Sequence, residues 1–215
     1  MNILVNEIFY SIQGEGPNVG KPSIFLRLGG CNLACTWCDS KFTWDPKVAD
    51  NKLASISDII NKIKKYPCKH VVITGGEPML QQDKLRMIIT KLPGYTFEIE
   101  TNGSIECKIS DILEQINCSP KLKNSGNAPY SLKIGPTNPK AVFKFVVQKK
   151  EDLKEIKVYV RQNKIDKSKI YLMPEGVNKK VIQERSQWLV EICKKEGYNF
   201  TSRLHILLYD DKRAV

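Results

Sequence analysis

Short apolar runs alternate with helical patterns along most of the chain. The short runs are rich in β-branched and aromatic residues, and they predict strands at residues 23–28, 70–74, 96–100, 142–147, 169–173 and 203–208. Apolar residues at helical spacing predict helices at residues 55–66, 83–92, 151–163 and 179–195, and a weaker one at 111–115. Strands and helices that alternate in this way are typical of a mostly parallel α/β sheet.

The helix predicted at residues 55–66 carries the clearest signals. Ser55 and Asp58 stand at the spacing of a capping box, in which the two side chains satisfy free N–H groups at a helix start. Its apolar stripe consists of Ile56, Ile59, Ile60 and Ile63. A helix with one apolar stripe covers one face of a sheet.

The number of strand–helix steps limits the fold class. Five or six steps are too few for a complete eight-unit barrel, which typically needs about 250 residues. We therefore expect an α/β fold that forms a partial, compressed TIM-like βα barrel with mostly parallel strands, as a single domain over residues 1–215. Residues 123–139 are rich in Asn, Gly, Ser and Pro, which predicts a surface loop rather than a linker.

Charge and hydropathy limit where the protein is expected to act and what it is expected to bind. No run of eighteen apolar residues occurs, and the first residues have neither a basic nor an apolar leader pattern, so we expect a cytoplasmic protein that does not bind membranes. A net charge of +11 suits a nucleic-acid binder or an enzyme for anionic small molecules. Many lysines stand at exposed-looking helix positions, however, and a solvated surface also explains them.

Three cysteines predict the chemistry. Cys31, Cys35 and Cys38 follow a predicted strand within eight residues, too close together to join distant parts of a fold as disulfides. Thiolates are the usual ligands of iron–sulfur clusters, and three of them leave one iron of a 4Fe–4S cluster open to bind a cofactor. A zinc site or a ferredoxin-type site is the alternative. Zinc sites, however, favour a second ligand pair, and the other four cysteines are scattered singly.

This cysteine motif resembles that of the radical S-adenosylmethionine superfamily. The motif is Cys-x3-Cys-x2-Cys with an aromatic residue, here Trp37, just before the last cysteine. The resemblance implies that the amino and carboxylate groups of S-adenosylmethionine chelate the open iron. Electron transfer then breaks a carbon–sulfur bond and gives a 5′-deoxyadenosyl radical. The cofactor supplies the reactive chemistry and the protein positions it.

Within the superfamily the chain resembles the 7-carboxy-7-deazaguanine synthase family. The similarity involves residues 7–16, 25–27 and 38–44 and the ending around residues 204–213. It implies radical ring contraction of 6-carboxy-5,6,7,8-tetrahydropterin to 7-carboxy-7-deazaguanine with loss of ammonia, towards queuosine and related deazapurines. It also implies a small homodimeric lyase with a 4Fe–4S cluster, S-adenosylmethionine and Mg²⁺, which takes electrons from a flavodoxin-like or other reductant.

The same resemblance implies roles for single residues. Ser40 would bind Mg²⁺ through a hard oxygen, although its hydroxyl would otherwise cap the next turn. Arg27 would bind the substrate carboxylate, with an internal salt bridge as the alternative. Thr74 and Gly76, in a Thr-Gly-Gly-Glu-Pro stretch, would contact substrate and cofactor respectively, or form a simple turn. The other residues implied for cofactor binding are Trp37, Cys38, Asp39, Ser119, Pro120, Lys121, Met173, Pro174, Glu175 and Gly176.

Both ends of the chain complete the expected site. The stretch Ile12-Gln13-Gly14 would read the edge of the pterin, with Glu15 as a further candidate. The Val215 carboxylate would bound the pocket if the tail folds over it, and so would His205, which is otherwise a core residue at the end of an apolar strand. The tail departs from the family at Ala214, where Gly is expected. Glu98 and Glu100 share one face of their strand.

Two other functions fit part of the sequence. An activase that makes a glycyl radical on a partner protein carries the same cysteine spacing, but the Gln-Gly-Glu loop and the Lys-Arg tail argue against it. A non-catalytic basic module that binds metal and docks on RNA would hold zinc rather than iron. The family resemblance favours a small-molecule substrate and no direct contact with nucleic acid.

Overall fold

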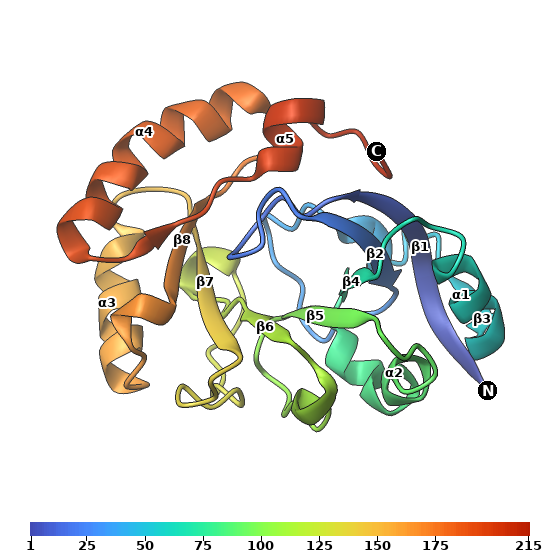
Figure 1. The fold of residues 1–215 in the computed structure, drawn as a ribbon. Coiled ribbons are helices and arrows are strands. Elements are labelled where there is room, and N and C mark those ends of the chain that lie inside the picture. The colour runs from blue at the N-terminus through green and yellow to red at the C-terminus, as the bar shows by residue number, and fades with distance from the viewer.

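A computed structural model describes residues 1–215 as one curved sheet with most of its helices on its outer side (Figure 1). The strands are β1 (Asn2–Ile12), β2 (Pro22–Leu28), β3 (Lys52–Ser55), β4 (His70–Gly75), β5 (Thr96–Thr101), β6 (Gln115–Cys118), β7 (Ala141–Val147), β8 (Ile170–Pro174) and β9 (Asn199–Phe200). The helices are α1 (Ile56–Ile63), α2 (Gln82–Ile89), α3 (Asp152–Gln162), α4 (Lys179–Glu196) and α5 (Leu204–Tyr209).

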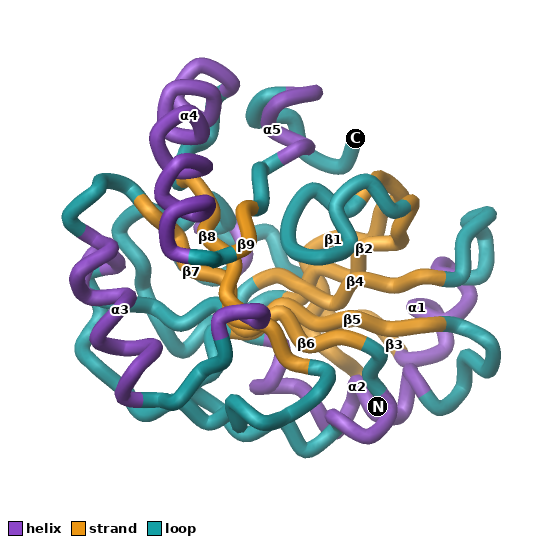
Figure 2. Tube along the Cα trace, turned by 60° about the vertical axis from the view of Figure 1, so that its left-hand side comes forward, coloured by secondary structure: helices purple, strands orange, loops and turns teal.

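The sheet confirms the predicted open barrel. Its nine strands run in the order β3-β1-β2-β4-β5-β6-β7-β8-β9. Strands β2 and β4 to β9 pair in parallel, while β1 pairs antiparallel with β2 and β3. Strands β9 and β3 form the two ends and do not pair with each other, so the sheet curls without closing (Figure 2). The carboxyl ends of the parallel strands therefore face one shared side.

In helix α1, the predicted cap and the predicted apolar stripe are both present. The Ser55 hydroxyl accepts a hydrogen bond from the Asp58 N–H, as the capping pattern predicted. Ile56, Ile59, Ile60 and Ile63 are all buried against the sheet. Full burial of such a side chain stabilises the fold by about 1.5–3 kcal/mol. The helices predicted at residues 83–92, 151–163 and 179–195 are confirmed as α2, α3 and α4.

The sequence pattern does not predict strands β1, β3 and β6, nor the two-residue strand β9. Strand β1 alternates buried Ile3 and Val5 with more exposed neighbours, but a bulge between Val5 and Glu7 moves the next buried residue to Ile8. The bulge breaks the two-residue period on which prediction depends. Strands β3 and β6 have four residues each, too few for a period to show. The helix predicted at 111–115 is therefore wrong, because the chain there enters β6 after a short 3₁₀ turn.

The predicted strand at residues 203–208 is also wrong. This apolar run forms helix α5, in which only Ile206 is buried. The last strand is instead β9, two residues long, which pairs with β8. A short apolar run does not distinguish a strand from a helix by period alone. The remaining predicted strands are confirmed within one or two residues as β2, β4, β5, β7 and β8.

The open side of the barrel is bridged by side chains and loops rather than by strand pairing. The loop of residues 13–21, between β1 and β2, reaches the segment before α5: Gly16 N–H donates to Thr201 Oγ1 (2.8 Å), and Leu204 N–H donates to the Gly14 carbonyl (2.9 Å). We call this contact between residues 13–21 and 201–204 the seam. Beyond α5, the chain runs back towards β1 (Figure 1). No helix of the structure combines the length and apolar composition needed to cross a membrane.

Candidate active site

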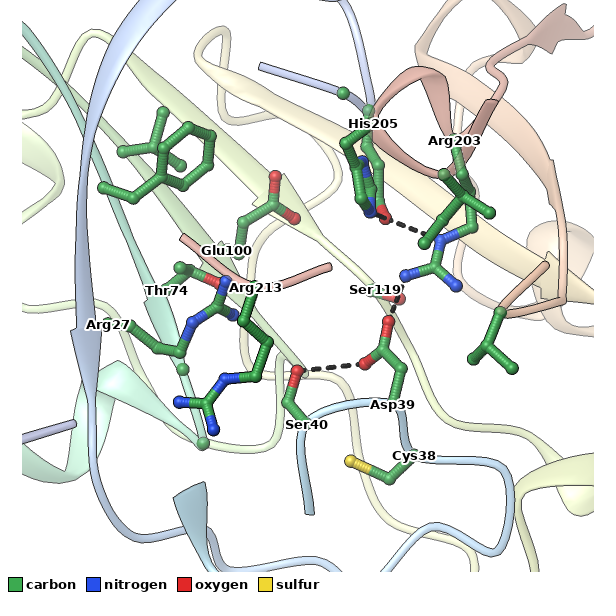
Figure 3. Close-up of a pocket in the computed structure, with 18 of the residues that line it drawn as sticks. Arg27, Cys38, Asp39, Ser40, Thr74, Glu100, Ser119, Arg203, His205 and Arg213 are labelled. Atoms are coloured by element: carbon green, nitrogen blue, oxygen red, sulfur yellow. Dashed lines mark hydrogen bonds and ion pairs between the residues drawn. The ribbon is translucent and has the colours of Figure 1, made fainter. Parts of the chain in front are cut away.

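A pocket of about 310 Å³ lies where the seam, the cysteine loop, the strand ends and the C-terminal tail meet (Figure 3). Most of the residues singled out from the sequence line it: Ile12, Gln13, Gly14, Arg27, Cys31, Cys35, Trp37, Cys38, Asp39, Ser40, Thr74, Gly76, Ser119, Lys121, Met173, Glu175 and Val215. Pro120, Pro174 and Gly176 do not line it. The fold thus gathers candidates from distant parts of the chain around one cavity.

Each cysteine sulfur in the loop receives an N–H donor. Cys31 Sγ accepts from the Leu33 backbone (3.4 Å), Cys35 Sγ from the Asn127 side chain (3.1 Å) and Cys38 Sγ from the Trp44 indole (3.3 Å). Such donors stabilise sulfur in its thiolate form and tune a bound cluster.

Burial works against the bare thiolates. It raises the pKa of Cys31 to about 11 and also raises the pKa of Cys38. Metal binding needs deprotonated sulfur, so positively charged irons would offset the cost of burying the charge. All three thiols are free of disulfides. Three reduced sulfurs with N–H donors on a pocket wall fit a 4Fe–4S cluster with one open iron.

The cysteine loop rests on the segment predicted to be a surface loop. Trp37 Nε1 donates to the Asn124 carbonyl (2.7 Å), and Thr36 N–H donates to the Ser125 carbonyl (3.0 Å). On the pocket side, the Lys121 ammonium lies 5.6 Å from the centre of the Trp37 ring and donates to Ser119 Oγ (2.7 Å). Trp37 thus fixes the loop through its side chain.

The Gly-Gly-Glu-Pro stretch packs directly against the start of the cysteine loop. A Cβ at Gly76 would lie 1.9 Å from the Gly30 carbonyl oxygen, which no real side chain can do. The Glu77 N–H donates to the same carbonyl (2.8 Å). The buried Glu77 carboxylate accepts from Thr101 Oγ1 (2.8 Å) and the Asn102 N–H (2.7 Å). Glu77 therefore joins the ends of β4 and β5, and its carboxylate also accepts from the Met79 N–H (2.9 Å), which caps the 3₁₀ turn that follows.

Two guanidinium groups share one carboxylate at one end of the pocket. Arg27 Nε donates to Glu7 Oε1 (2.8 Å), and Arg213 Nη2 donates to Glu7 Oε2 (3.2 Å). Arg213 also lies 3.6 Å above the Phe42 ring, and Arg27 lies 5.6 Å from the centre of that ring. The salt bridge considered for Arg27 does exist. Two cations against one anion nevertheless leave a net positive charge to receive a ligand carboxylate.

Ser40 does not cap the turn that follows it. Its carbonyl accepts from the Thr43 N–H (2.9 Å), while its hydroxyl makes no capping bond and instead donates to Asp39 Oδ1 (3.0 Å). Burial raises the pKa of Asp39, but the Arg203 guanidinium bonded to it outweighs burial and holds that pKa below its ordinary value. A hydroxyl and an ionised carboxylate thus stand side by side, and both are hard oxygen donors. The Asp39 side chain therefore places a second oxygen donor beside that of Ser40.

The Gln13 side chain stabilises its own loop, residues 13–21. Its side chain is buried and donates to Glu98, and its Oε1 accepts from the Glu15 N–H (3.2 Å). Asn18 also donates to Glu98, which is fully buried on β5. As predicted, Glu98 and Glu100 share the inner face of β5. Glu98 holds the loop, and Glu100 lines the pocket.

His205 lies against the same loop, at the start of α5 rather than at the end of a strand. A Cβ on Gly14 would fall 2.0 Å from His205 Nδ1, so the ring needs a glycine at that position. His205 Nε2 lies 4.0 Å from Glu15 Oε1. Burial lowers the pKa of His205, which keeps the ring neutral at pH 7.

The segment after β8 is held by arginines. Glu175 pairs with Arg185 of α4, and the Gly176 carbonyl accepts from Arg203 Nη1. Gly176 therefore does not line the pocket itself but contacts Arg203, which does. Pro174 closes β8 at the same edge.

A buried network of charges was not predicted from the sequence. Lys144 of β7 donates to Glu15 and Glu100, and Arg203 donates to Glu15 and Asp39. Lys144 and Arg203 are nearly fully buried. The signal for Lys144 was present, because it is the single charged residue in the otherwise apolar strand β7. Arg203 lay in a segment assigned to the wrong element.

Comparison with known proteins identifies the chain. A model of the radical SAM superfamily matches residues 26–119. The 7-carboxy-7-deazaguanine synthase of Pyrobaculum aerophilum is 33% identical over 99% of this chain and 97% of its own length. The chain belongs to the 7-carboxy-7-deazaguanine synthase family. The synthase of Aquifex aeolicus is 36% identical over 91% of this chain and 88% of its own.

Members of this family are radical SAM enzymes, and the superfamily implies a 4Fe–4S cluster and S-adenosylmethionine. A solved structure supports the same assignment. The crystal structure of QueE from Escherichia coli matches with a TM-score of 0.75 and 26% identity, over 95% of both chains. The family therefore accounts for both the partial barrel and the cysteine loop on its wall.

Proposed function

We propose that the chain is a lyase that converts 6-carboxy-5,6,7,8-tetrahydropterin to 7-carboxy-7-deazaguanine and ammonia, in the biosynthesis of queuosine or related deazapurines. Product and ammonia together contain all the atoms of the substrate, so the reaction needs no net oxidant. Family membership supports this assignment. The observation that carries it is one pocket lined by three N–H-bonded cysteines and, at another end, by the positive group Arg27–Glu7–Arg213.

We assign the 4Fe–4S cluster to Cys31, Cys35 and Cys38. When bound there, the cluster supplies the electron that cleaves S-adenosylmethionine reductively. Backbone at Gly76 lies against the cysteine loop and is open to a ligand on its pocket side. For the rest of the S-adenosylmethionine site we propose Trp37, Asp39, Ser119, Pro120, Lys121, Met173, Pro174, Glu175 and Gly176. Pro120, Pro174 and Gly176 would act by shaping the chain, because they do not line the cavity.

We assign the substrate carboxylate to the positive end of the pocket. Glu7 and the Phe42 ring fix the orientation of the Arg27 side chain. Its remaining N–H groups are therefore already oriented to bind a carboxylate. Ile12, Gln13, Gly14, Thr74 and Val215 line the rest of the substrate space in this proposal. A neutral His205 is able to accept a proton beside them.

We also propose a magnesium ion at Ser40, with Asp39 as the neighbouring oxygen donor. Magnesium usually keeps few protein ligands and completes its shell with water or substrate oxygens. Replacing Ser40 (Ser40→Ala) should therefore raise the Mg²⁺ concentration needed for half-maximal product formation. Ser57→Ala on α1, an exposed serine, is the control. An unchanged Mg²⁺ requirement in Ser40→Ala would argue against this metal site.

Turnover tests the function. Reduced, cluster-loaded protein should form deazaguanine and ammonia in equal amounts from the carboxypterin, only when S-adenosylmethionine is present. Arg27→Met should raise the KM for the carboxypterin, whereas Arg161→Met, an exposed arginine on α3, should not. Cleavage of S-adenosylmethionine without deazaguanine would rule out this synthase and direct attention to a glycyl-radical activase. A zinc-loaded protein with strongly salt-dependent RNA affinity would favour the RNA module.

Three features of the enzyme are proposed on the family resemblance. A flavodoxin-like or other small electron carrier would reduce the cluster, because the cysteine loop lies at a pocket wall rather than in the core. The enzyme would act as a homodimer. The whole chain would act as one radical SAM domain, since residues outside 26–119 supply Arg203, His205 and the tail to the pocket.

A further inference from the structure

Lys144 has an unusual place for a lysine. It stands in the middle of β7, between the fully buried Phe143 and the buried Phe145, with its ammonium inside the barrel. Burying an ammonium group is strongly unfavourable unless it is paired and hydrogen-bonded. Here it is paired twice: Nζ donates to Glu15 Oε2 (2.5 Å) and to Glu100 Oε2 (2.7 Å).

The two carboxylates come from different parts of the chain. Glu15 belongs to the loop of residues 13–21 and Glu100 to β5, so Lys144 ties that loop to two strands of the parallel sheet. The Lys144 side chain is 4% exposed, whereas each glutamate side chain is 17% exposed. What the pocket presents at this end is therefore mainly two carboxylates, with the cation behind them. Figure 3 shows Glu100 directed into the cavity.

The remaining contacts leave room for a ligand. Arg203 Nε donates to Glu15 Oε1 (3.0 Å), and Asn117 Nδ2 donates to Glu100 Oε1 (3.0 Å). Each carboxylate offers about four lone-pair positions, and two are used in each. Free positions on the exposed side suit a ligand edge that consists of N–H groups.

We propose that Lys144 is a positioning residue that keeps Glu15 and Glu100 both ionised and directed into the pocket, where they accept the N–H groups of the 2-aminopyrimidinone edge of the substrate. This proposal rests on the proposed function, because that function supplies such an edge. It also assigns a polarity to the pocket. The carboxylate of the substrate lies towards Arg27, and its N–H edge lies towards the glutamates.

The electrostatic role follows from the groups that face each glutamate. Glu15 faces Lys144 of β7, Arg203 before α5, His205 of α5 and Glu100 of β5. Burial raises the pKa of Glu15, but Lys144 and then Arg203 lower it well below its ordinary value. Two carboxylates that share a site without a cation cannot both stay ionised near neutral pH.

Glu100 is the more sensitive of the two. It faces Lys144, Glu15, Glu98 on its own strand and Asn117 of β6. Burial raises the pKa of Glu100 even with Lys144 present, and Lys144 opposes that rise. Removal of the ammonium would raise this pKa further. As the pH falls, Glu100 would then become protonated at a higher pH than in the parent enzyme. The acidic limb of the kcat/KM profile should therefore move to higher pH.

The test compares Lys144→Met with Lys144→Arg and with Lys150→Met. Lys150 follows β7 and is exposed, so its variant controls for loss of one lysine. In cluster-loaded enzyme, Lys144→Met should raise the KM for the carboxypterin about tenfold or more, as loss of charge-assisted bonding would. Cleavage of S-adenosylmethionine without substrate should stay within about twofold of the parent, because Lys144 does not touch the cysteine loop. Lys144→Arg should restore most of the substrate affinity.

Binding of pterin-6-carboxylate, followed by its fluorescence, separates this proposal from the proposed function. If the parent enzyme binds this probe but makes no deazaguanine, the function fails and Lys144 is still judged by the probe. Lys144→Met should weaken probe binding about tenfold and shift its pH dependence upward. Equal binding by Lys144→Met and the parent would overturn the proposal. So would parallel loss of probe binding and S-adenosylmethionine cleavage that Lys144→Arg does not rescue, since this would indicate a structural role alone.

If Lys144→Met fails to fold, the double variant Lys144→Met with Glu100→Gln provides the test. It removes the unpaired carboxylate from β5, and with it the main cost of the single change. The double variant should fold and still bind the probe weakly. Binding as tight as in the parent would overturn the proposal.

Discussion

At the residue scale, the proposed cluster site consists of three cysteines and their N–H donors. Cys38→Ala should abolish cluster binding and product formation, because the loop offers only three thiolates and the proposed cluster needs all of them. Visible absorbance together with iron and sulfide content measures the loss. Cys193→Ala, at a buried cysteine of α4, should keep a full cluster. A cluster of normal content in Cys38→Ala would contradict the ligand assignment.

Gly76 offers a second prediction at this scale. Any side chain there would collide with the Gly30 backbone at the start of the cysteine loop. Gly76→Ala should lower the free energy of unfolding by about 2 kcal/mol or more, as overpacking does, and should reduce cluster content.

The matched control is Gly135→Ala. A Cβ at Gly135 meets nothing within 4 Å, and its backbone suits any residue. Its free energy of unfolding should therefore be unchanged or slightly higher. Denaturant unfolding of both variants gives the comparison, and equal stabilities would show that the cysteine loop can move away from Gly76.

The residue scale is also where sequence reasoning reached furthest. The cysteines, Arg27 and Gly76 stand in local motifs, so they could be singled out without a fold, and the structure places them on one pocket. The Lys144 network could not be predicted in this way. Along the chain, Glu15 is 129 residues from Lys144 and 188 residues from Arg203, and only the fold brings them together.

At the element scale, periodicity predicted long helices and buried parallel strands. It failed at β1, where a bulge shifts the period, and at β3 and β6, which are too short to show one. It also failed at α5, whose apolar run has the length of a strand. These errors share a cause: in each case, tertiary contacts rather than local pattern decide the conformation.

The tail after α5 leads to a prediction at this scale. Arg213 joins the tail to β1 through Glu7 and stacks on Phe42. Its side chain is 48% exposed, so its contacts are worth only about 1 kcal/mol. Arg213→Ala should raise the KM for the carboxypterin roughly three- to tenfold with little change in stability. Steady-state kinetics and thermal unfolding measure the two effects, and Arg161→Ala on α3 is the control. A KM equal to that of the parent would remove Arg213 from the substrate site.

At the scale of the whole molecule, charge is divided between surface and pocket. The chain carries a net charge of +11, yet the Lys144 network combines Glu15, Glu100 and Asp39 with only two buried cations. A basic surface raises the local concentration of an anionic substrate. The pocket then orients that substrate, because its two ends differ in sign.

The seam has a consequence for how the molecule fluctuates. Strand pairing holds β4 to β8 together, whereas loops and side chains alone hold residues 13–21 to residues 201–204. The Gly16 and Leu204 amides should therefore exchange their hydrogens together, through local opening, and faster than the Ile73 amide of β4. Hydrogen exchange read by mass spectrometry measures this. A ligand at about one hundred times its Kd should slow seam exchange about a hundredfold, if only the closed seam binds it. Breathing of the barrel and entry of the substrate would then be one motion.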